Sequence, residues 1–254
     1  VLEKMSPSYL ASMRLLRDQV PSFTDYPFSL PAIHGMDEIS FHPKVTFLVG
    51  ENGSGKSTLL EAIAVKWGFN PEGGSRGFGF STRDSHSSLQ ECLRLSKGIQ
   101  LPKDGYFFRA ESFFNVATEI EHIDEETKDS NSMPISASYG RRSLHEQSHG
   151  ESFMTLVMDR FYGGGFYLLD EPEAALSPTR QLALLARMHE LVQSDSQFVI
   201  ATHSPILMAY PDAKILSLQP EGVTEVAYEE TEHYAVTRQF LHDHRRMLNQ
   251  LLND

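Results

Sequence analysis

The stretch that decides the fold is KVTFLVGENGSGKSTLLEAIAVKW, residues 44 to 67. Its first six residues, 44 to 49, form a short run rich in apolar and β-branched side chains, which is typical of a buried strand. A glycine-rich turn follows, and a longer apolar stretch comes after it. Strand, glycine turn and helix in this order predict a βα unit that binds phosphate.

The glycine turn itself carries a specific pattern. Residues 50 to 58, GENGSGKST, satisfy G-x-x-x-x-G-K-[ST] in full. The glycines let backbone N–H groups turn inward around phosphates, Lys56 places a positive charge on the phosphate oxygens, and Ser57 offers a hydroxyl to Mg²⁺. A glycine turn that only capped a helix would not explain the lysine. We therefore predict a phosphate site formed by Asn52, Gly53, Ser54, Gly55, Lys56, Ser57 and Thr58.

Apolar strands and helices alternate farther along the chain. Residues 151–162 predict a helix that ends at three glycines, 166–170 and 197–201 predict buried strands, and Ser177-Pro178 predicts the start of a helix that runs to about Gln193. The segments KILSL and VTEVAY predict a hairpin, and the tail from about 231 to 254 predicts one amphipathic helix. This order predicts an α/β fold with a mostly parallel sheet flanked by helices and a smaller antiparallel portion.

The middle of the chain, about residues 68 to 145, is expected to be an inserted helical and loop region within a single domain of residues 1–254. SLQECLRL, residues 88–95, predicts a short helix, and GYFFRAESFF, residues 105–114, predicts a strand. Residues 121–130 are acidic and polar and predict a surface loop whose carboxylates could bind a cation.

Two carboxylates and a histidine follow the predicted buried strands. Asp170 at the end of one strand is placed to hold Mg²⁺, and Glu171 is placed to act as the base that polarises water. His203 follows the next strand and therefore belongs to the same carboxyl edge of the sheet as Lys56 and Asp170. We expect it to contact the terminal phosphate, although a lone histidine is often only a core residue.

Composition limits the classes of partner. The net charge of −12 argues against a broad, sequence-independent nucleic-acid groove, although local pairs such as Arg141-Arg142 and Arg245-Arg246 leave a small basic patch possible. The single cysteine, Cys92, cannot form an internal disulfide, and no apolar run reaches the length of a membrane span. Without a signal-peptide core at the N-terminus, these features predict a cytoplasmic protein.

Residues 145–152, HEQSHGES, allow three readings. H-E-x-x-H is a sequence motif of zinc hydrolases. A zinc site of this kind also needs a third ligand and an intact helix around both histidines. Gly150-Glu151-Ser152 could begin a G-x-S-x-G nucleophile elbow, but Met154 stands where the second glycine should be. The remaining reading is a phosphate-binding helix start.

With these motifs together, the chain resembles an ABC-type ATPase of the compact SMC/RecF-like branch over about residues 26 to 218. GENGSGKST is similar to a Walker A motif, SHGES to the signature, LLDEP to Walker B, EAALSP to the D-loop and ATHSP to the switch-histidine loop. Segments such as NPEGGSR, FFRAESFF and YLLDEPEAALSP also resemble small stand-alone bacterial AAA-family ATPases. The resemblance implies ATP as ligand, Mg²⁺ as cofactor, and a P-loop fold with an ABC-type ATPase head.

The resemblance also implies a second copy of the chain at the site. Ser148, His149, Gly150 and Glu151 take the four signature positions, so that Ser148 and Gly150 would bind the γ-phosphate held by the other protomer of an ATP-dependent homodimer. Hydrolysis would then release a head-to-tail dimer that acts on an unidentified protein or nucleic-acid partner.

Several departures from the family pattern leave roles open. His149 replaces a signature glycine, and Ser177 stands where transporter-type D-loops place aspartate. The lid residue could be Arg109 or Glu111. The adenine-stacking aromatic could be Tyr26 or Phe28, which could equally be core residues.

Three other functions share these motifs: a nucleotide-binding subunit of a transporter, a DNA-repair or anti-phage effector, and an ATP-gated scaffold that does not hydrolyse ATP. Co-purification with membranes, hydrolysis stimulated by DNA, and ATP binding without turnover would respectively identify them.

Overall fold

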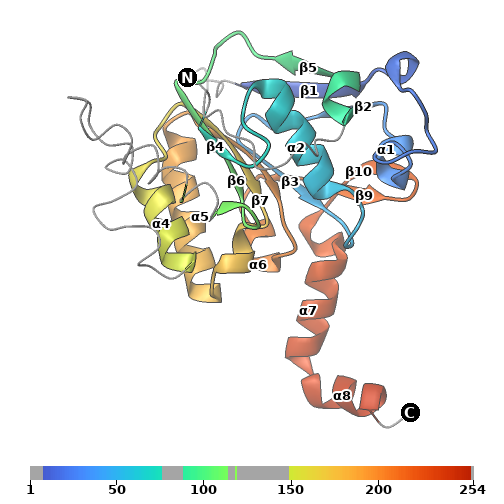
Figure 1. Cartoon of the computed structure of the whole chain (residues 1–254). Coiled ribbons are helices and arrows are strands. Elements are labelled where there is room, and N and C mark those ends of the chain that lie inside the picture. Colours follow the sequence, from blue (N-terminus) through green and yellow to red (C-terminus); the bar gives the residue numbers. More distant parts are fainter. Residues whose placement is uncertain (1–7, 76–87, 114–117, 119–148, 253–254) are drawn as a thin grey trace, which may run out of the picture.

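The computed structural model describes residues 8–75, 88–113, 118 and 149–252, and it is built around two sheets (Figure 1). The larger sheet has seven strands in the order β10-β9-β3-β8-β7-β6-β4. Its strands are β3 (Val45–Val49), β4 (Gly74–Ser75), β6 (Asp104–Arg109), β7 (Gly165–Asp170), β8 (Gln197–Ala201), β9 (Lys214–Gln219) and β10 (Gly222–Val226). The five inner strands run parallel, and the edge strands β10 and β4 pair antiparallel. The predicted mostly parallel α/β sheet is therefore confirmed.

A second sheet of three antiparallel strands, in the order β2-β1-β5, lies above the first. It consists of β1 (Leu10–Leu15), β2 (Glu38–Ser40) and β5 (Leu93–Lys97). The Gln197 side chain connects the two sheets, because its amide accepts from the backbone N–H groups of Tyr9 and Leu10 and donates to the carbonyls of Leu10 and His42. The predicted antiparallel portion is confirmed in the β9–β10 hairpin, and the structure adds this separate sheet, which the sequence did not predict.

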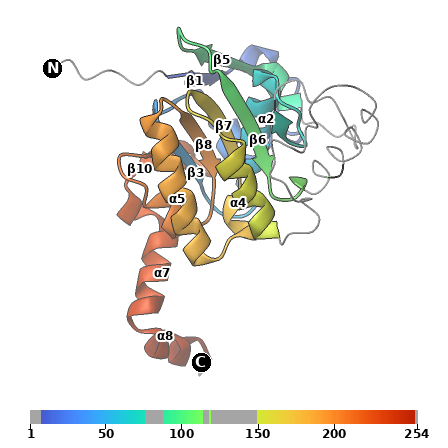
Figure 2. The same ribbon diagram turned by 90° about the vertical axis from the view of Figure 1, so that its left-hand side faces the viewer.

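Helices cover both faces of the larger sheet, whereas the last two helices of the chain extend away from it (Figures 1 and 2). The helices are α1 (Pro31–His34), α2 (Lys56–Trp67), α4 (His149–Asp159), α5 (Pro178–Gln193), α6 (Pro205–Met208), α7 (Glu232–His242) and α8 (His244–Leu252). Single 3₁₀ turns lie at η1 (Arg17–Gln19), η2 (Ser88–Cys92), η5 (Pro172–Ala175) and η6 (Tyr228–Glu230). Helices α2 and α5 agree with the two best-defined helices of the sequence analysis.

Side chains of β7 alternate between the two cores, as the pleat of a strand requires. Phe166 and Leu168 pack with α2 and the small sheet, whereas Tyr167 and Leu169 pack with α4, α5 and α6. Every residue of β7 is buried, which explains why its sequence is a continuous apolar run. Helices α2 and α4 therefore lie on opposite faces of the sheet.

Two sequence predictions about local structure were wrong. The tail forms two helices, because Asp243 leaves the helical conformation at φ −149° and ψ 68° and its carboxylate accepts from the Arg246 N–H to begin α8. The segment SLQECLRL gives only a 3₁₀ turn at η2, and from Leu93 it becomes β5, whose alternate side chains reach the core beside β1. Long-range pairing here outweighs local helix propensity.

The stretch 68–145 contributes β4, η2, β5 and β6 where it is described, and β6 lies in the larger sheet beside β7. The acidic segment 121–130 and Arg141-Arg142 lie outside the described residues. The extent of an inserted subdomain therefore stays a prediction. Along the part of the chain that the structure describes, no helix is both long and apolar enough to cross a membrane.

Candidate active site

The glycine turn between β3 and α2 folds around the ammonium group of Lys56. Lys56 Nζ donates to the carbonyls of Gly50 and Glu51, each at 3.0 Å, and the side chain is buried. Gly55 precedes the helix at φ +98°, a left-handed conformation that L side chains rarely adopt, and a Cβ there would lie 3.1 Å from Leu30 Cδ1. Burial lowers the pKa of Lys56, while Glu171 and other nearby carboxylates counteract this effect.

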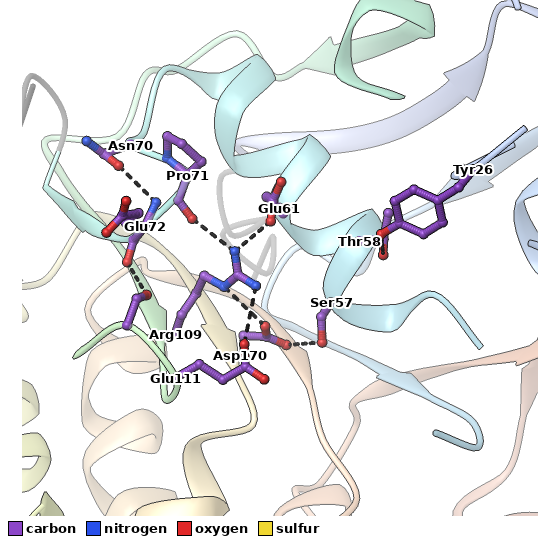
Figure 3. Close-up of polar contacts among 11 residues, drawn as sticks. Tyr26, Ser57, Thr58, Glu61, Asn70, Pro71, Glu72, Arg109, Glu111 and Asp170 are labelled. Atoms are coloured by element: carbon purple, nitrogen blue, oxygen red, sulfur yellow. Dashed lines mark hydrogen bonds and ion pairs between the residues drawn. The ribbon is translucent and has the colours of Figure 1, made fainter. Parts of the chain in front are cut away.

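The first helical turn of α2 is connected to the end of β7 by one hydrogen bond (Figure 3). Ser57 Oγ donates to Asp170 Oδ1 at 2.9 Å. Asp170 is only 6% exposed, and this burial raises the pKa of its carboxyl from 3.8 to about 6, although Arg109 and Ser57 act in the opposite direction. The protein thus holds a desolvated carboxylate beside the phosphate loop.

This pair of oxygen donors fits Mg²⁺, which prefers carboxylate and hydroxyl oxygens and keeps several of its own waters. A buried carboxylate whose negative charge is costly gains most from a cation. In the glycine loop, Ser54 Oγ is buried and has no hydrogen-bond partner among the described residues. Such an unsatisfied hydroxyl is what we expect of a group that binds a ligand. Ser57 and Asp170 are the residues that would hold the ion.

Arg109 and Glu111, the two candidates for the lid residue, have different environments (Figure 3). Arg109 is half-buried at the end of β6, where Nη1 contacts Glu61 Oε2 at 2.6 Å and Nε lies 3.7 Å from Asp170 Oδ2. Glu111 has a side chain that is 90% exposed, 3.9 Å from Arg109 Nη2. Arg109 is therefore part of the charged environment of Asp170, and Glu111 is free to reach solvent.

Glu171 begins the turn after β7 in an unusual conformation. Its φ is +49°, and its backbone N–H donates to the carbonyl of Ala201 at 2.9 Å. A left-handed non-glycine residue carries backbone strain, which persists where the surrounding structure holds it in place. This conformation leaves the side chain 41% exposed with Oε1 3.8 Å from Nε2 of His203.

His203 is held from two sides. Its backbone N–H donates to Glu173 Oε1 at 2.5 Å, and its Nδ1 lies 2.9 Å from Nε2 of His233. Burial, Lys56 and His233 lower the pKa of His203, and Glu171 raises it. Burial also raises the pKa of Glu173. The histidine therefore contacts two residues that the sequence did not point to, Glu173 and His233.

The structure brings Lys56, Ser57, Asp170, Glu171 and His203 together at the carboxyl edge of the parallel strands, as the sequence predicted. Glu173 could have been suspected, since it lies two residues after Glu171 in the same motif. His233 could not, because it is 30 residues from His203 in an unremarkable helical segment.

Of the signature segment, the structure describes only the residues from His149 onward. Ser148, with His145 and the rest of the H-E-x-x-H spelling before it, lies outside the described residues, and α4 begins at His149. Gly150 packs so closely against the turn before α5 that a Cβ would meet the carbonyl oxygen of Ala175 at 2.4 Å. Glu151 Oε1 lies 3.3 Å from Arg180 Nη2, on the helix-covered face opposite α2.

Ser177 has a local structural role where the family pattern expected aspartate. It is the N-cap of α5, and its hydroxyl accepts from the Arg180 N–H at 3.4 Å. This explains the serine by helix capping alone.

The two aromatic candidates for adenine stacking are now distinguishable. Phe28 is 1% exposed and belongs to the core, so its candidacy was wrong. Tyr26 is 66% exposed, and its hydroxyl lies 3.0 Å from Thr58 Oγ1 (Figure 3). Residues Gly50–Ser54 also line a pocket of about 530 Å³ that extends to the β9–β10 turn and to Glu232 and His233.

Comparison with known proteins gives two adjacent family matches. Residues 32–148 match the family described as "AAA domain", and residues 143–209 match "AAA domain, putative AbiEii toxin, Type IV TA system". The two matches meet at the signature segment, so together they span both the phosphate loop and the carboxylates after β7.

Individual proteins of similar sequence or structure include ATP-binding proteins of transporters and an SMC head domain. A protein of Caldanaerobacter subterraneus subsp. tengcongensis, named as a putative ABC transporter ATP-binding protein, is 29% identical over 78% of this chain and 86% of its own. The energy-coupling factor transporter ATP-binding protein EcfA2 of Streptococcus sanguinis is 27% identical over 70% of this chain and 67% of its own. Among solved structures, the SMC head domain from Thermotoga maritima is 17% identical over 86% of this chain and 98% of that chain, with a TM-score of 0.44.

The complete G-x-x-x-x-G-K-[ST] loop, the Ser57–Asp170 hydrogen bond at its helix, and the family and relative matches lead to one assignment. The matches to two AAA-domain families and to ABC transporter ATP-binding proteins support an ABC-type ATPase with an AAA-family domain.

Proposed function

We propose that this ATPase is Mg²⁺-dependent and works as a head-to-tail dimer that ATP closes and hydrolysis releases. The observation that carries the proposal is the hydrogen bond from Ser57 to Asp170, which joins the two predicted Mg²⁺ donors beside Lys56. When bound, Mg²⁺ would neutralise charge on the phosphate oxygens. Lys56 binds the β- and γ-phosphates, and the other loop residues, from Asn52 to Thr58, surround them with N–H groups and hydroxyls.

Glu171 is the proposed base. Its carboxylate is partly exposed at the edge of the site, held by a strained backbone and next to His203. A water there would give its proton to Glu171 as its oxygen attacks the γ-phosphorus, and the bond from that phosphorus to the β–γ bridging oxygen would break, so that ADP leaves. His203 would donate a hydrogen bond to a γ-phosphate oxygen.

A second copy is needed because the signature and the phosphate loop belong to opposite faces of the sheet. Gly150 and Glu151 begin α4 on one face, while Lys56 begins α2 on the other. Ser148, Gly150 and Glu151 of one protomer would complete the site of the other, where the N-terminus of α4 favours an anion.

The variant Glu171→Gln tests this mechanism, since it keeps the side-chain shape and removes the base. We expect ATP to bind, hydrolysis to fall by about 10²-fold or more, and dimers to accumulate in Mg²⁺-ATP. Adding Ser148→Arg should return the protein to monomer with ATP binding retained. Met158→Arg, which adds the same charge to the exposed far end of α4, is the matched control and should leave the dimer intact.

Light scattering after size exclusion, with and without Mg²⁺-ATP, measures the outcome. A Glu171→Gln protein that stays monomeric at saturating ATP, or a dimer that persists with Ser148→Arg, would refute the composite site. Neither result would affect the family assignment.

The partner on which the dimer acts is a separate question. One relative, EcfA2, is named as an energy-coupling factor transporter ATP-binding protein, and another, CbiO of Salmonella typhimurium, as a cobalt import ATP-binding protein. This favours a transporter subunit as the second candidate function. Co-purification of the full chain with a membrane protein would support it, whereas hydrolysis stimulated by DNA would support a nucleic-acid partner.

A further inference from the structure

A direct contact between two histidines joins the ATP site to the C-terminal helices. His203 Nδ1 lies 2.9 Å from His233 Nε2, and the two ring centroids are 5.1 Å apart. His233 lies in the first turn of α7, which leaves the body of the protein and continues into α8 (Figures 1 and 2).

The pair shares one hydrogen atom. Burial lowers the pKa of both imidazoles, and the nearby Lys56 ammonium acts in the same direction on each. Two carboxylates raise the pKa values instead: Glu171 acts on His203, and Glu232 acts on His233. Both rings are therefore neutral near pH 7.5, so in the contact one nitrogen donates and the other accepts.

The surroundings of His203 decide which nitrogen donates. Its Nε2 has no hydrogen-bond partner among the described residues and lies 3.8 Å from Glu171 Oε1. A carboxylate only accepts, so a lone pair on Nε2 would face like charge, whereas an N–H would be attracted. The favoured tautomer of His203 carries its hydrogen on Nε2, and Nδ1 then accepts from His233 Nε2–H.

We propose that His233 is a positioning residue for ATP hydrolysis, because its Nε2–H holds His203 in the tautomer and orientation that direct the His203 Nε2–H toward the reacting phosphate. The proposal rests on the role proposed above for His203. It adds that the first turn of α7 is part of the catalytic arrangement, so that any displacement of the C-terminal helices reaches the active site through one hydrogen bond.

Nitrogen NMR of ¹⁵N-histidine-labelled protein tests the tautomer without nucleotide. The chain has 11 histidines, and the spectra of His203→Gln and His233→Gln assign the two signals. We expect His203 to be neutral at pH 7.5 with Nε2 protonated and Nδ1 unprotonated. A His203 that is protonated at Nδ1, or at both nitrogens, would overturn the proposal.

Kinetics test the consequence. His233→Ala should lower kcat by about tenfold or more, part of the roughly 10²–10³-fold that one donor to a transition state contributes, with little change in KM for ATP. His233→Gln, whose amide can donate from the position of Nε2, should recover kcat to within about threefold of the wild type. His242→Gln, a matched change at an exposed position on the same helix, should leave kcat unchanged.

Wild-type kcat in His233→Ala, or a His233→Gln protein as slow as His233→Ala, would refute positioning by His233. A wild-type protein that hydrolyses no ATP would refute the proposed function instead, and the nitrogen spectra would still decide the tautomer.

Discussion

Replacing Asp170 by asparagine should make the nucleotide-free protein more stable, although it removes a proposed Mg²⁺ ligand. Burial raises the pKa of Asp170 from 3.8 to about 6, which means that the folded protein disfavours the carboxylate. Since each pH unit by which a pKa moves corresponds to about 1.4 kcal/mol, holding this charge at pH 7.5 costs about 3 kcal/mol of the free energy of unfolding. Asparagine keeps the size and can still accept from Ser57.

The pH dependence follows from the direction of the change. Stability associated with a raised carboxyl pKa is fully present below pH 3.8 and is lost as pH rises through about 6. Asp170→Asn does not titrate, so its advantage over the wild type should be near zero at pH 4 and reach about 3 kcal/mol at pH 7.5. Urea unfolding in EDTA at both values measures it.

Asp104, which lies at the opposite end of the paired strands β6 and β7, provides the matched control for Asp170→Asn. Its carboxylate accepts from Arg160 Nη1 at 2.8 Å and from the Tyr167 hydroxyl at 2.9 Å. Asp104→Asn weakens these bonds and should destabilise the protein by about 1–3 kcal/mol. If Asp170→Asn also destabilised the nucleotide-free protein at pH 7.5, the conclusion that the buried Asp170 carboxylate costs stability despite Arg109 and Ser57 would be refuted.

Two further predictions concern nucleotide binding. Lys56→Ala should abolish measurable ATP binding, because it removes the positive charge at the centre of the loop, and unchanged affinity in isothermal titration calorimetry would show that the loop is not the site. Tyr26→Ala should weaken ATP binding by about tenfold, as expected for loss of a stacked base worth about 1–3 kcal/mol, whereas Tyr26→Phe should bind within about threefold of the wild type. Equal losses in both variants would mean that the hydroxyl contact with Thr58 matters and stacking does not.

The sequence was sufficient for the elements whose signals are local. The strand and glycine loop before Lys56, the Ser177-Pro178 helix start and the apolar runs of β7 and β8 each occupy a few consecutive residues with strong preferences. Because parallel strands end at one edge of a sheet, their order also predicted that Asp170 and His203 would meet Lys56.

Other features depended on contacts between distant segments. Leu93 starts a strand only because β1 is available to pair with it, and β1 itself has no signal as clear as that of β3. Tyr26 and Phe28 are two residues apart and equally aromatic, but one faces solvent and the other enters the core. Burial is a property of the assembled molecule, so composition could not separate them.

The environment of each candidate site residue was likewise decided by the tertiary structure. The residue types at 170 and 203 predicted a metal ligand and a phosphate contact from sequence alone. The raised pKa of Asp170 arises from its burial in the folded protein. The proposed tautomer of His203 depends on His233 in α7, which lies 30 residues farther along the chain. Sequence specifies which groups are present, whereas desolvation and hydrogen bonding, which set their protonation, arise only when distant elements pack together.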